Sequence, residues 1–432
     1  MISPIYRRKI GYTTLYYKFL HSALSIIVKG EVCFLQQNAE KNAARGPLVL
    51  AAGAVVQLLT GIPAAWGVFQ RPIMEQFAFT RGQATLAFAV LVASYGIGCA
   101  LGGLLQDQKG PRPAALLGTG LLAAGFLLGA VVPNGNAPLF LLVYSVPAGL
   151  GSAFVAPAVL ACAQKWYATK KGWATGVTGV AMGLSGAFFT LVVRLVGGAW
   201  GMRVCLAVLG GLVLLLCGAG AAVLQDPPFL PQPASGKGRD IPPRQMLRTP
   251  QYKLCVAAVA LSAPPVLLFS PDILQFAADR GLPEEAAPWC IVLGSAASAV
   301  GRLSCPALSD RWGRKPVLYG IYAGLAVGSV GLAFAQGWLV LAAYAVLTLC
   351  YSGCAAVQPS FNSDLFGLKH AGINYGFLAL GMSAGSLLSY TGNRLLPEGL
   401  RHIAAGVCAV AGGLCVAVVK MPEAVEKPRR AR

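Results

Sequence analysis

Long apolar segments recur along the sequence between Pro47 and Val419, and they limit the possible fold more than any other feature. Each holds about 18 or more residues, and a helix needs about 20 to cross the roughly 30 Å hydrocarbon core of a bilayer. The composition agrees, because 56% of the residues are hydrophobic and only 11% are charged, against roughly 45–50% and 25% in soluble domains. The sequence therefore predicts an all-α integral membrane protein with about twelve transmembrane helices. The expected helices cover residues 47–70, 83–105, 113–132, 137–163, 172–197, 203–224, 251–277, 286–308, 316–335, 338–358, 373–391 and 399–420.

Basic residues gather in alternate connections and at both termini. The formal charge of +19 would suit a nucleic-acid partner, but this alternation is typical of membrane topology, so we expect no nucleic acid to bind. By the positive-inside rule, the side with the basic loops is cytoplasmic. Both termini are then cytoplasmic, and the chain is expected in an inner or plasma membrane. The loop residues concerned are Lys109, Arg112, Lys165, Lys170, Lys171, Lys237, Arg239, Arg244, Arg248, Arg311, Arg314, Lys315 and Lys369.

Changes in composition divide the chain into five parts. Residues 1–46 form a basic extension, which is either an interfacial helix or the result of a start codon assigned too far upstream. Residues 225–250 are rich in proline, glycine and basic side chains and read as a cytoplasmic linker. This linker separates a bundle of six helices at 47–224 from a second at 251–420, and 421–432 is a short tail.

The two bundles share short matches at nearly constant offsets, which indicates an internal repeat. A shift of 203 positions places Gly98, Asp107, Gly110 and Arg112 on Gly301, Asp310, Gly313 and Lys315. A shift of 200 places Gly172, Gly176 and Met182 on Gly372, Gly376 and Met382. Duplicated halves with a substrate site between them near the midplane are an established transporter architecture.

Two loop motifs carry a resemblance to a known family. The segments "GGLLQDQKGPR" at 102–112 and "SDRWGRK" at 309–315 resemble the cytoplasmic loop motif of the major facilitator superfamily, once in each half. The resemblance implies the major facilitator fold, and a charge network between the halves that stabilises one of two alternating conformations. The residues expected to form this conformational gate are Gly103, Asp107, Gly110, Arg112, Asp310, Arg311, Gly313 and Arg314.

A narrower resemblance comes from "QKWYATKKGWATGVTGVAMGLSGAFF" at 164–189. It is similar to the entry of the fifth helix in oxalate/formate antiporters and monocarboxylate transporters. The regularly spaced Gly176, Gly179 and Gly183 predict a groove that lets another helix approach closely. The segments "GIPAAWGVF", "LRTPQY" and "FNSDLFGLKHAGINYG" are similar to the same families.

Arg302 is the residue that points most directly to a function. It precedes Asp310 by eight residues, which is about 12 Å along a helix. If Asp310 lies at the cytoplasmic interface, Arg302 lies near the middle of the membrane. A charge there costs several kcal/mol unless it faces a wet cavity or a partner, so it predicts a functional site. The alternative is that its side chain reaches the cytoplasmic surface and anchors the loop.

The resemblance implies that Arg302 pairs with a substrate carboxylate, for which a guanidinium offers two parallel hydrogen bonds. Ser298 shares its helix face, while Tyr351, Gln358, Tyr144 and Tyr375 are further candidate ligands. Each of these could instead serve packing or an interfacial belt. Tyr95 is a weaker candidate of the same kind.

The sequence also departs from these families. Where oxalate transporters carry a second buried lysine in the eleventh helix, this chain has Gly381, Met382 and Ser383. One fixed charge balances one carboxylate, which predicts a secondary active transporter of a monocarboxylate such as formate, lactate or pyruvate. An oxalate/formate-type exchanger and a carboxylate sensor that does not transport remain alternatives. A co- or counter-transported ion stays open.

Other classes of protein lack their residues in this sequence. No Gly-rich loop ends in Gly-Lys-Ser/Thr, as an ATP-driven pump would need. The three histidines and twelve cysteines show no catalytic cluster and no metal-ligand spacing. We therefore expect a monomer surrounded by lipid, with no enzymatic activity, no metal and no cofactor.

Overall fold

A computed structural model describes residues 45–167, 171–227, 240–367 and 370–421. Contacts divide the chain after Leu48, and the fold lies in the part from Val49 onward. The expected extension 1–46, most of the linker and nearly all of the tail lie outside the described residues. The five domain boundaries therefore stay a prediction.

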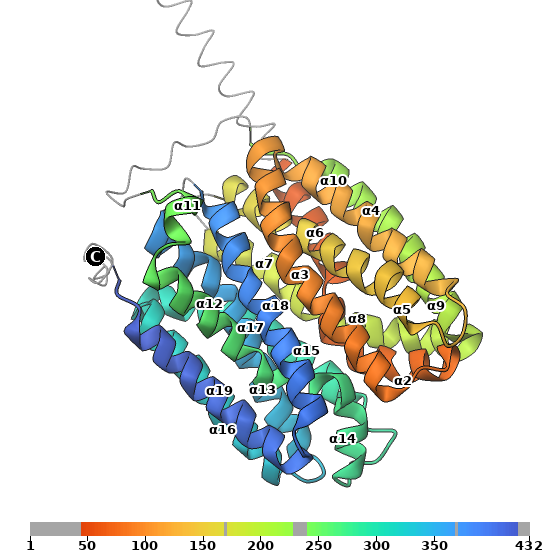
Figure 1. The fold of residues 1–432 in the computed structure, drawn as a ribbon. Helices are drawn as coiled ribbons and strands as arrows, with labels where there is room; N and C mark the ends of the chain where they lie inside the picture. Colours follow the sequence, from red (N-terminus) through yellow and green to blue (C-terminus); the bar gives the residue numbers. More distant parts are fainter. Residues whose placement is uncertain (1–44, 168–170, 228–239, 368–369, 422–432) are drawn as a thin grey trace, which may run out of the picture. The chain divides into compact units, whose positions relative to one another are not determined.

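The described part of the chain is built from helices throughout (Figure 1). In the first half, the helix Arg45–Thr60 is followed by α2 (Ile62–Phe77), α3 (Arg81–Lys109), α4 (Pro111–Ala130), α5 (Ala137–Phe140), α6 (Val146–Trp166), α7 (Lys171–Gly183), α8 (Ser185–Val192), α9 (Gly198–Leu212) and α10 (Gly218–Val223). In the second half lie α11 (Pro243–Met246), α12 (Pro250–Ser262), α13 (Pro264–Leu267), α14 (Ile273–Asp279), α15 (Trp289–Trp312), α16 (Arg314–Phe334), α17 (Leu339–Phe366), α18 (Ala371–Leu395) and α19 (Glu398–Val418).

The number of transmembrane segments agrees with the sequence. Nine helices in the described ranges are long and apolar enough to cross a membrane, or ten if Arg45–Thr60 and the helix after it, bent by 44°, form one span. The longest, Ala174–Val223, has 50 residues and turns at Gly201, whose φ is +82°, so it makes two crossings. Counted this way the described chain gives eleven crossings, and α18, which is long enough at 25 residues but not among the helices that also meet the apolar requirement, would be the twelfth.

Equivalent glycines give each half the same internal contact. A Cβ atom at Gly98 of α3 would lie 2.7 Å from Ala153 Cβ of α6. Its repeat partner Gly301 of α15 packs even more closely, against the backbone carbonyl of Leu349 in α17. Both pairs of helices can touch only because neither glycine carries a side chain. The internal repeat predicted from the sequence therefore also appears as an equivalent helix–helix contact in each half.

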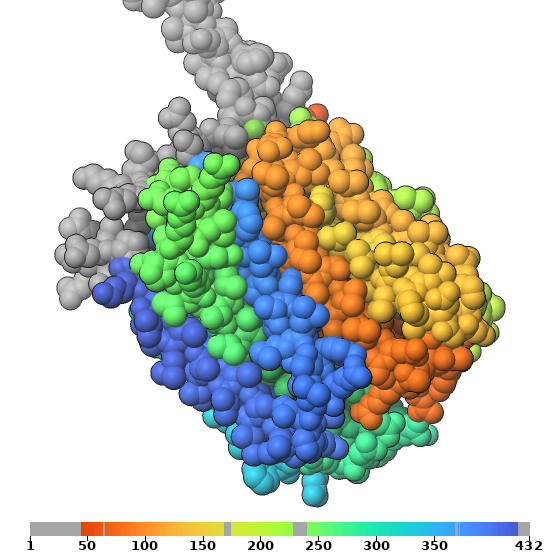
Figure 2. Space-filling view, viewed as in Figure 1, coloured from red at the N-terminus to blue at the C-terminus, as the bar shows by residue number. Residues whose placement is uncertain are grey.

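The contacts between the halves obey the same symmetry. A Cβ at Gly176 of α7 would lie 2.5 Å from Leu303 Cδ1 of α15, and one at Gly376 of α18 would lie 2.6 Å from Ala100 Cα of α3. The α18–α3 pair continues through Ser383 Oγ, which donates to the carbonyl of Ala93 at 2.6 Å. Figure 2 shows α18, in blue, against α3, in orange. Two crossed helix pairs thus join the halves.

The loop motifs form tight turns at equivalent places. Gly110 joins α3 to α4 with φ at +85°, and Gly313 joins α15 to α16 with φ at +92°. Side-chain residues rarely adopt positive φ, so each turn requires glycine. Backbone geometry alone therefore explains why Gly110 and Gly313 occupy the same place in the two motifs.

Candidate functional site

A cavity with about 160 Å³ of free space lies between the two halves. The first half contributes residues of α2, α3, α6 and α7, and the second contributes residues of α13, α15, α17 and α18. The repeat-related Met182 and Met382 both line it, so equivalent residues of the two halves face this space. Arg302 is the only charged side chain that lines it in the described parts of the chain.

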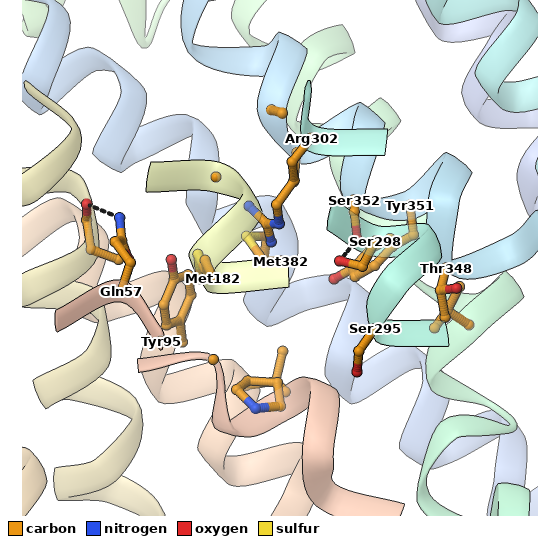
Figure 3. A pocket seen from close by; sticks show the side chains of 18 of the residues that line it. Gln57, Tyr95, Met182, Ser295, Ser298, Arg302, Thr348, Tyr351, Ser352 and Met382 are labelled. Atoms are coloured by element: carbon orange, nitrogen blue, oxygen red, sulfur yellow. Dashed lines mark hydrogen bonds between the residues drawn. The ribbon is translucent and has the colours of Figure 1, made fainter. Parts of the chain in front are cut away.

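Arg302 extends from α15 into the cavity, with Tyr95 and Tyr351 on opposite sides of it in Figure 3. Gly179 of α7 lies directly behind it, since a Cβ there would be 3.2 Å from Arg302 Cβ. Tyr95, Tyr375 and Tyr351 line the same cavity as the guanidinium. Its Nε has no hydrogen-bond partner, and no carboxylate of the described residues forms an ion pair with it.

The face of α15 around Arg302 carries hydroxyl groups. Ser298 is one turn away and shares a 2.5 Å hydrogen bond with Ser352 of α17. Ser295 is a further turn away, lines the cavity and has no partner for its hydroxyl. Ser298 and Ser295 thus form a polar stripe beside the guanidinium.

Two of the other candidate ligands line the same space, and two do not. Tyr351 and Tyr375 are cavity residues. Gln358 lies instead at a small adjoining cavity that shares both tyrosines with the main one. Tyr144 is fully buried in an aromatic cluster of the first half, with its ring 4.7 Å from that of Phe140. This packing corrects the expectation that Tyr144 is a ligand.

Several cavity residues had no counterpart in the sequence prediction, among them Thr348 and Ser352 of α17. Their signal was helical spacing. Thr348 lies three residues before Tyr351 and four before Ser352, and residues at these spacings are neighbours on a helix surface. Thr175 and Thr178 of α7 also line the cavity. They lie among the glycines of the segment at 164–189, which pointed to helix packing and not to ligand binding.

A sequence model of the Major Facilitator Superfamily matches residues 49–390. The chain belongs to the major facilitator superfamily. Among its relatives is "Oxalate:formate antiporter" of Oxalobacter formigenes, 24% identical over 332 residues, or 74% of this chain and 77% of that one. "Monocarboxylate transporter 3" of Rattus norvegicus is 27% identical over 257 residues, 58% of this chain and 52% of that protein. The crystal structure of the proton:xylose symporter XylE shares the fold with a TM-score of 0.69 at 15% identity, covering 89% of this chain and 98% of the symporter.

The superfamily motif of the first half reaches across to the second half. The carboxylate of Asp107 in α3 accepts a 3.1 Å hydrogen bond from the backbone N–H of Ile373, in the first turn of α18. A carboxylate is favoured there by the partial positive charge of the helix start. Gly103 permits the approach, because a Cβ at that position would lie 2.8 Å from the Gly372 carbonyl.

The motif of the second half differs from the expected network between halves. Arg314 pairs with Asp310 at 2.6 Å and with Asp364 at the end of α17 at 3.0 Å, and both partners are in the same half. Arg311 is exposed, as is Arg112 in the first half. Of the motif's charged residues in the described chain, Asp107 is thus the one with a hydrogen bond to the other half.

A second set of contacts joins the halves at the opposite end of the superfamily fold. Asp272, which follows α13, pairs with Arg81 of α3 at 3.0 Å and accepts a hydrogen bond from Gln70 of α2. Arg71 and Glu284 form another pair across the halves at 2.7 Å. Charged contacts between halves therefore lie on both sides of the cavity.

Proposed function

We propose that this major facilitator transporter moves a small organic anion, a monocarboxylate, by secondary active transport with alternating access. One observation carries the proposal. Arg302 offers an unpaired guanidinium to a cavity formed by both halves. An unpaired charge in such a place is costly, and an anionic substrate removes that cost with two parallel hydrogen bonds.

The number of fixed charges supports a single carboxylate. Arg302 is the one cation lining the cavity among the described residues, and the three tyrosines around it can donate to the same carboxylate. In the stretch of the eleventh helix where oxalate transporters carry a second buried lysine, this chain has Met382, which lines the cavity, and Gly381, which packs against the backbone of Val256. A doubly charged oxalate would leave one negative charge without a counter-charge.

The contacts on either side of the cavity support alternating access. Asp107 holds α18 at the end with the loop motifs, and Asp272 holds α3 at the other end. A substrate can leave only if one set opens while the other stays closed. We place the motif end on the cytoplasmic side because the basic loops lie there.

Counterflow of labelled formate, lactate, pyruvate and oxalate into proteoliposomes tests the proposal. We expect exchange of a monocarboxylate, and a loss of at least tenfold in both Arg302→Ala and Arg302→Lys, because lysine lacks the bidentate geometry. Arg394→Ala removes an exposed arginine of the same half and serves as the matched control.

The alternatives give different results in the same experiment. Oxalate exchange as efficient as that of a monocarboxylate indicates an oxalate/formate-type exchanger. Binding that depends on Arg302, without any flux, indicates a sensor. Equal transport by wild type and both Arg302 variants would refute the assignment of the anion site.

A further inference from the structure

The cavity is larger than a formate or a lactate requires. Its free space of about 160 Å³ is comparable to the roughly 150 Å³ of an engineered apolar cavity that holds a benzene molecule. A three-atom anion bound to Arg302 would leave most of this volume to water. A ligand larger than formate or lactate is therefore needed to fill the space beyond the guanidinium.

Most polar side chains of the wall already use their hydrogen-bonding groups inside the protein. Gln57 donates to the Ala156 carbonyl at 3.0 Å and its side-chain oxygen accepts from Thr60. Thr178 donates to the carbonyl of Ala174, and Thr348 donates to that of Tyr344. Such groups offer little to a ligand, although they appear polar in the sequence.

The groups still free to bind a ligand lie together. They are the guanidinium of Arg302, whose Nε has no hydrogen-bond partner, and the Ser295 hydroxyl; Tyr351 and Tyr375 line the same space. A ligand with polar atoms along its whole length would lose hydrogen bonds to water without replacing them, at a cost of about 1–3 kcal/mol for each group.

Apolar wall continues from Arg302 in both directions. Toward the start of α15 lies Ile291, eleven residues earlier, or about 16 Å along the helix, together with Val266, Leu267 and Val92. On the opposite side are Leu160 and Pro157 of α6, with Ala355, Ala356 and Pro359 of α17. A ligand whose charged end binds Arg302 must place its remaining atoms against one of these surfaces.

We infer that the preferred substrate is an amphipathic monocarboxylate, with a single carboxylate on Arg302 and an unsubstituted apolar body of about five to eight carbons in the cavity. Linear or branched alkanoates and aryl carboxylates have this chemistry. Formate and polyhydroxylated acids do not. The inference rests on the proposed function, because it uses the same anion site.

Competition against labelled hexanoate counterflow in proteoliposomes tests the inference. The competitors are acetate, butyrate, hexanoate, benzoate and gluconate. Hexanoate and gluconate form the matched pair, with six carbons and one carboxylate each, and differ in the hydroxyl groups. We expect affinity to rise about fourfold for each added CH₂ up to the limit of the cavity, with gluconate weaker than acetate.

Two variants locate the apolar body. Both act on the side of the cavity lined by α6 and α17. Ala356→Leu narrows that side and should lower hexanoate affinity at least tenfold while changing acetate affinity little. Leu160→Ala enlarges the same side and should extend the longest accepted chain. The inference is wrong if neither variant changes how affinity depends on chain length, or if gluconate competes as well as hexanoate.

The failure of the inference can be told apart from the failure of the proposed function. Affinities that do not depend on chain length but vanish in Arg302→Ala overturn the apolar body and leave the anion site standing. Affinities that are unchanged in Arg302→Ala overturn the anion site, and with it both proposals.

Discussion

The glycine face of α7 gives the most direct test of how closely the two halves meet. A Cβ at Gly183 would lie 2.5 Å from both Cα and N of Ala299 in α15. Ordinary carbon contacts begin near 3.5 Å, so Gly183→Ala requires the helices to separate by about 1 Å. These are backbone atoms and cannot rotate away. Overpacking of this kind costs about 1–3 kcal/mol, partly offset by the roughly 0.5–1 kcal/mol that alanine gains over glycine in a helix.

Two other glycines in the same protein calibrate the effect. At Gly176 the nearest atom is the flexible Leu303 Cδ1, which can move, so Gly176→Ala should cost less. Gly211 of α9 has nothing within 4 Å of its would-be Cβ. Gly211→Ala should therefore stabilise by about 0.5–1 kcal/mol.

Thermal unfolding of the purified protein in detergent measures this order, and initial uptake rates in proteoliposomes measure its functional counterpart. We expect Gly183→Ala to have the lowest midpoint, Gly176→Ala an intermediate one and Gly211→Ala a midpoint at or above wild type. Uptake should fall most for Gly183→Ala, because the contact lies one turn from Arg302. A Gly183→Ala protein as stable and active as Gly211→Ala would show that α7 and α15 do not meet in this way.

Four further substitutions have definite expected results. Asp272→Asn removes an ion pair with a half-exposed partner, worth about 0–1 kcal/mol; spin-label distances across that end should show a wider-open population, up to about fivefold larger. Asp107→Asn keeps an acceptor for Ile373 N–H but loses the charge, and the weaker neutral bond should change uptake rates by about two- to fivefold. Tyr144→Phe removes a buried hydroxyl without a partner and should leave uptake unchanged and stability equal or higher. Tyr375→Phe, in the cavity, should instead weaken the apparent affinity for a carboxylate.

The helices and the height of Arg302 along its helix could be predicted because both follow from local distances. An apolar run of about 20 residues has one solution in a bilayer. The eight residues between Arg302 and Asp310 fix a height along one helix, whichever way the helices are arranged. The same reasoning could not decide on Tyr144, since its segment, Leu141–Ser145, and α6 after it are largely apolar on every face and give no sign of which side meets the cavity.

The contacts between halves lay beyond prediction for a different reason. Asp272 and Arg81 are far apart in the chain and meet only through packing. In the second loop motif, Arg314 found Asp364 within its own half. When a charged side chain has several possible partners, the tertiary fold decides which ion pair forms, and the spacing of residues in the sequence does not.

The symmetry of the scaffold and the asymmetry of the site together indicate how the substrate would travel. The glycine contacts are repeated in both halves, but the guanidinium is not, because the position equivalent to Arg302 is the buried Cys99. Arg302, Tyr351 and Tyr375 all belong to the second half, whereas Tyr95 belongs to the first. An anion bound to Arg302 would therefore stay with the second half while the first half moves past it. The contact with Tyr95 would be the one that changes between the two conformations.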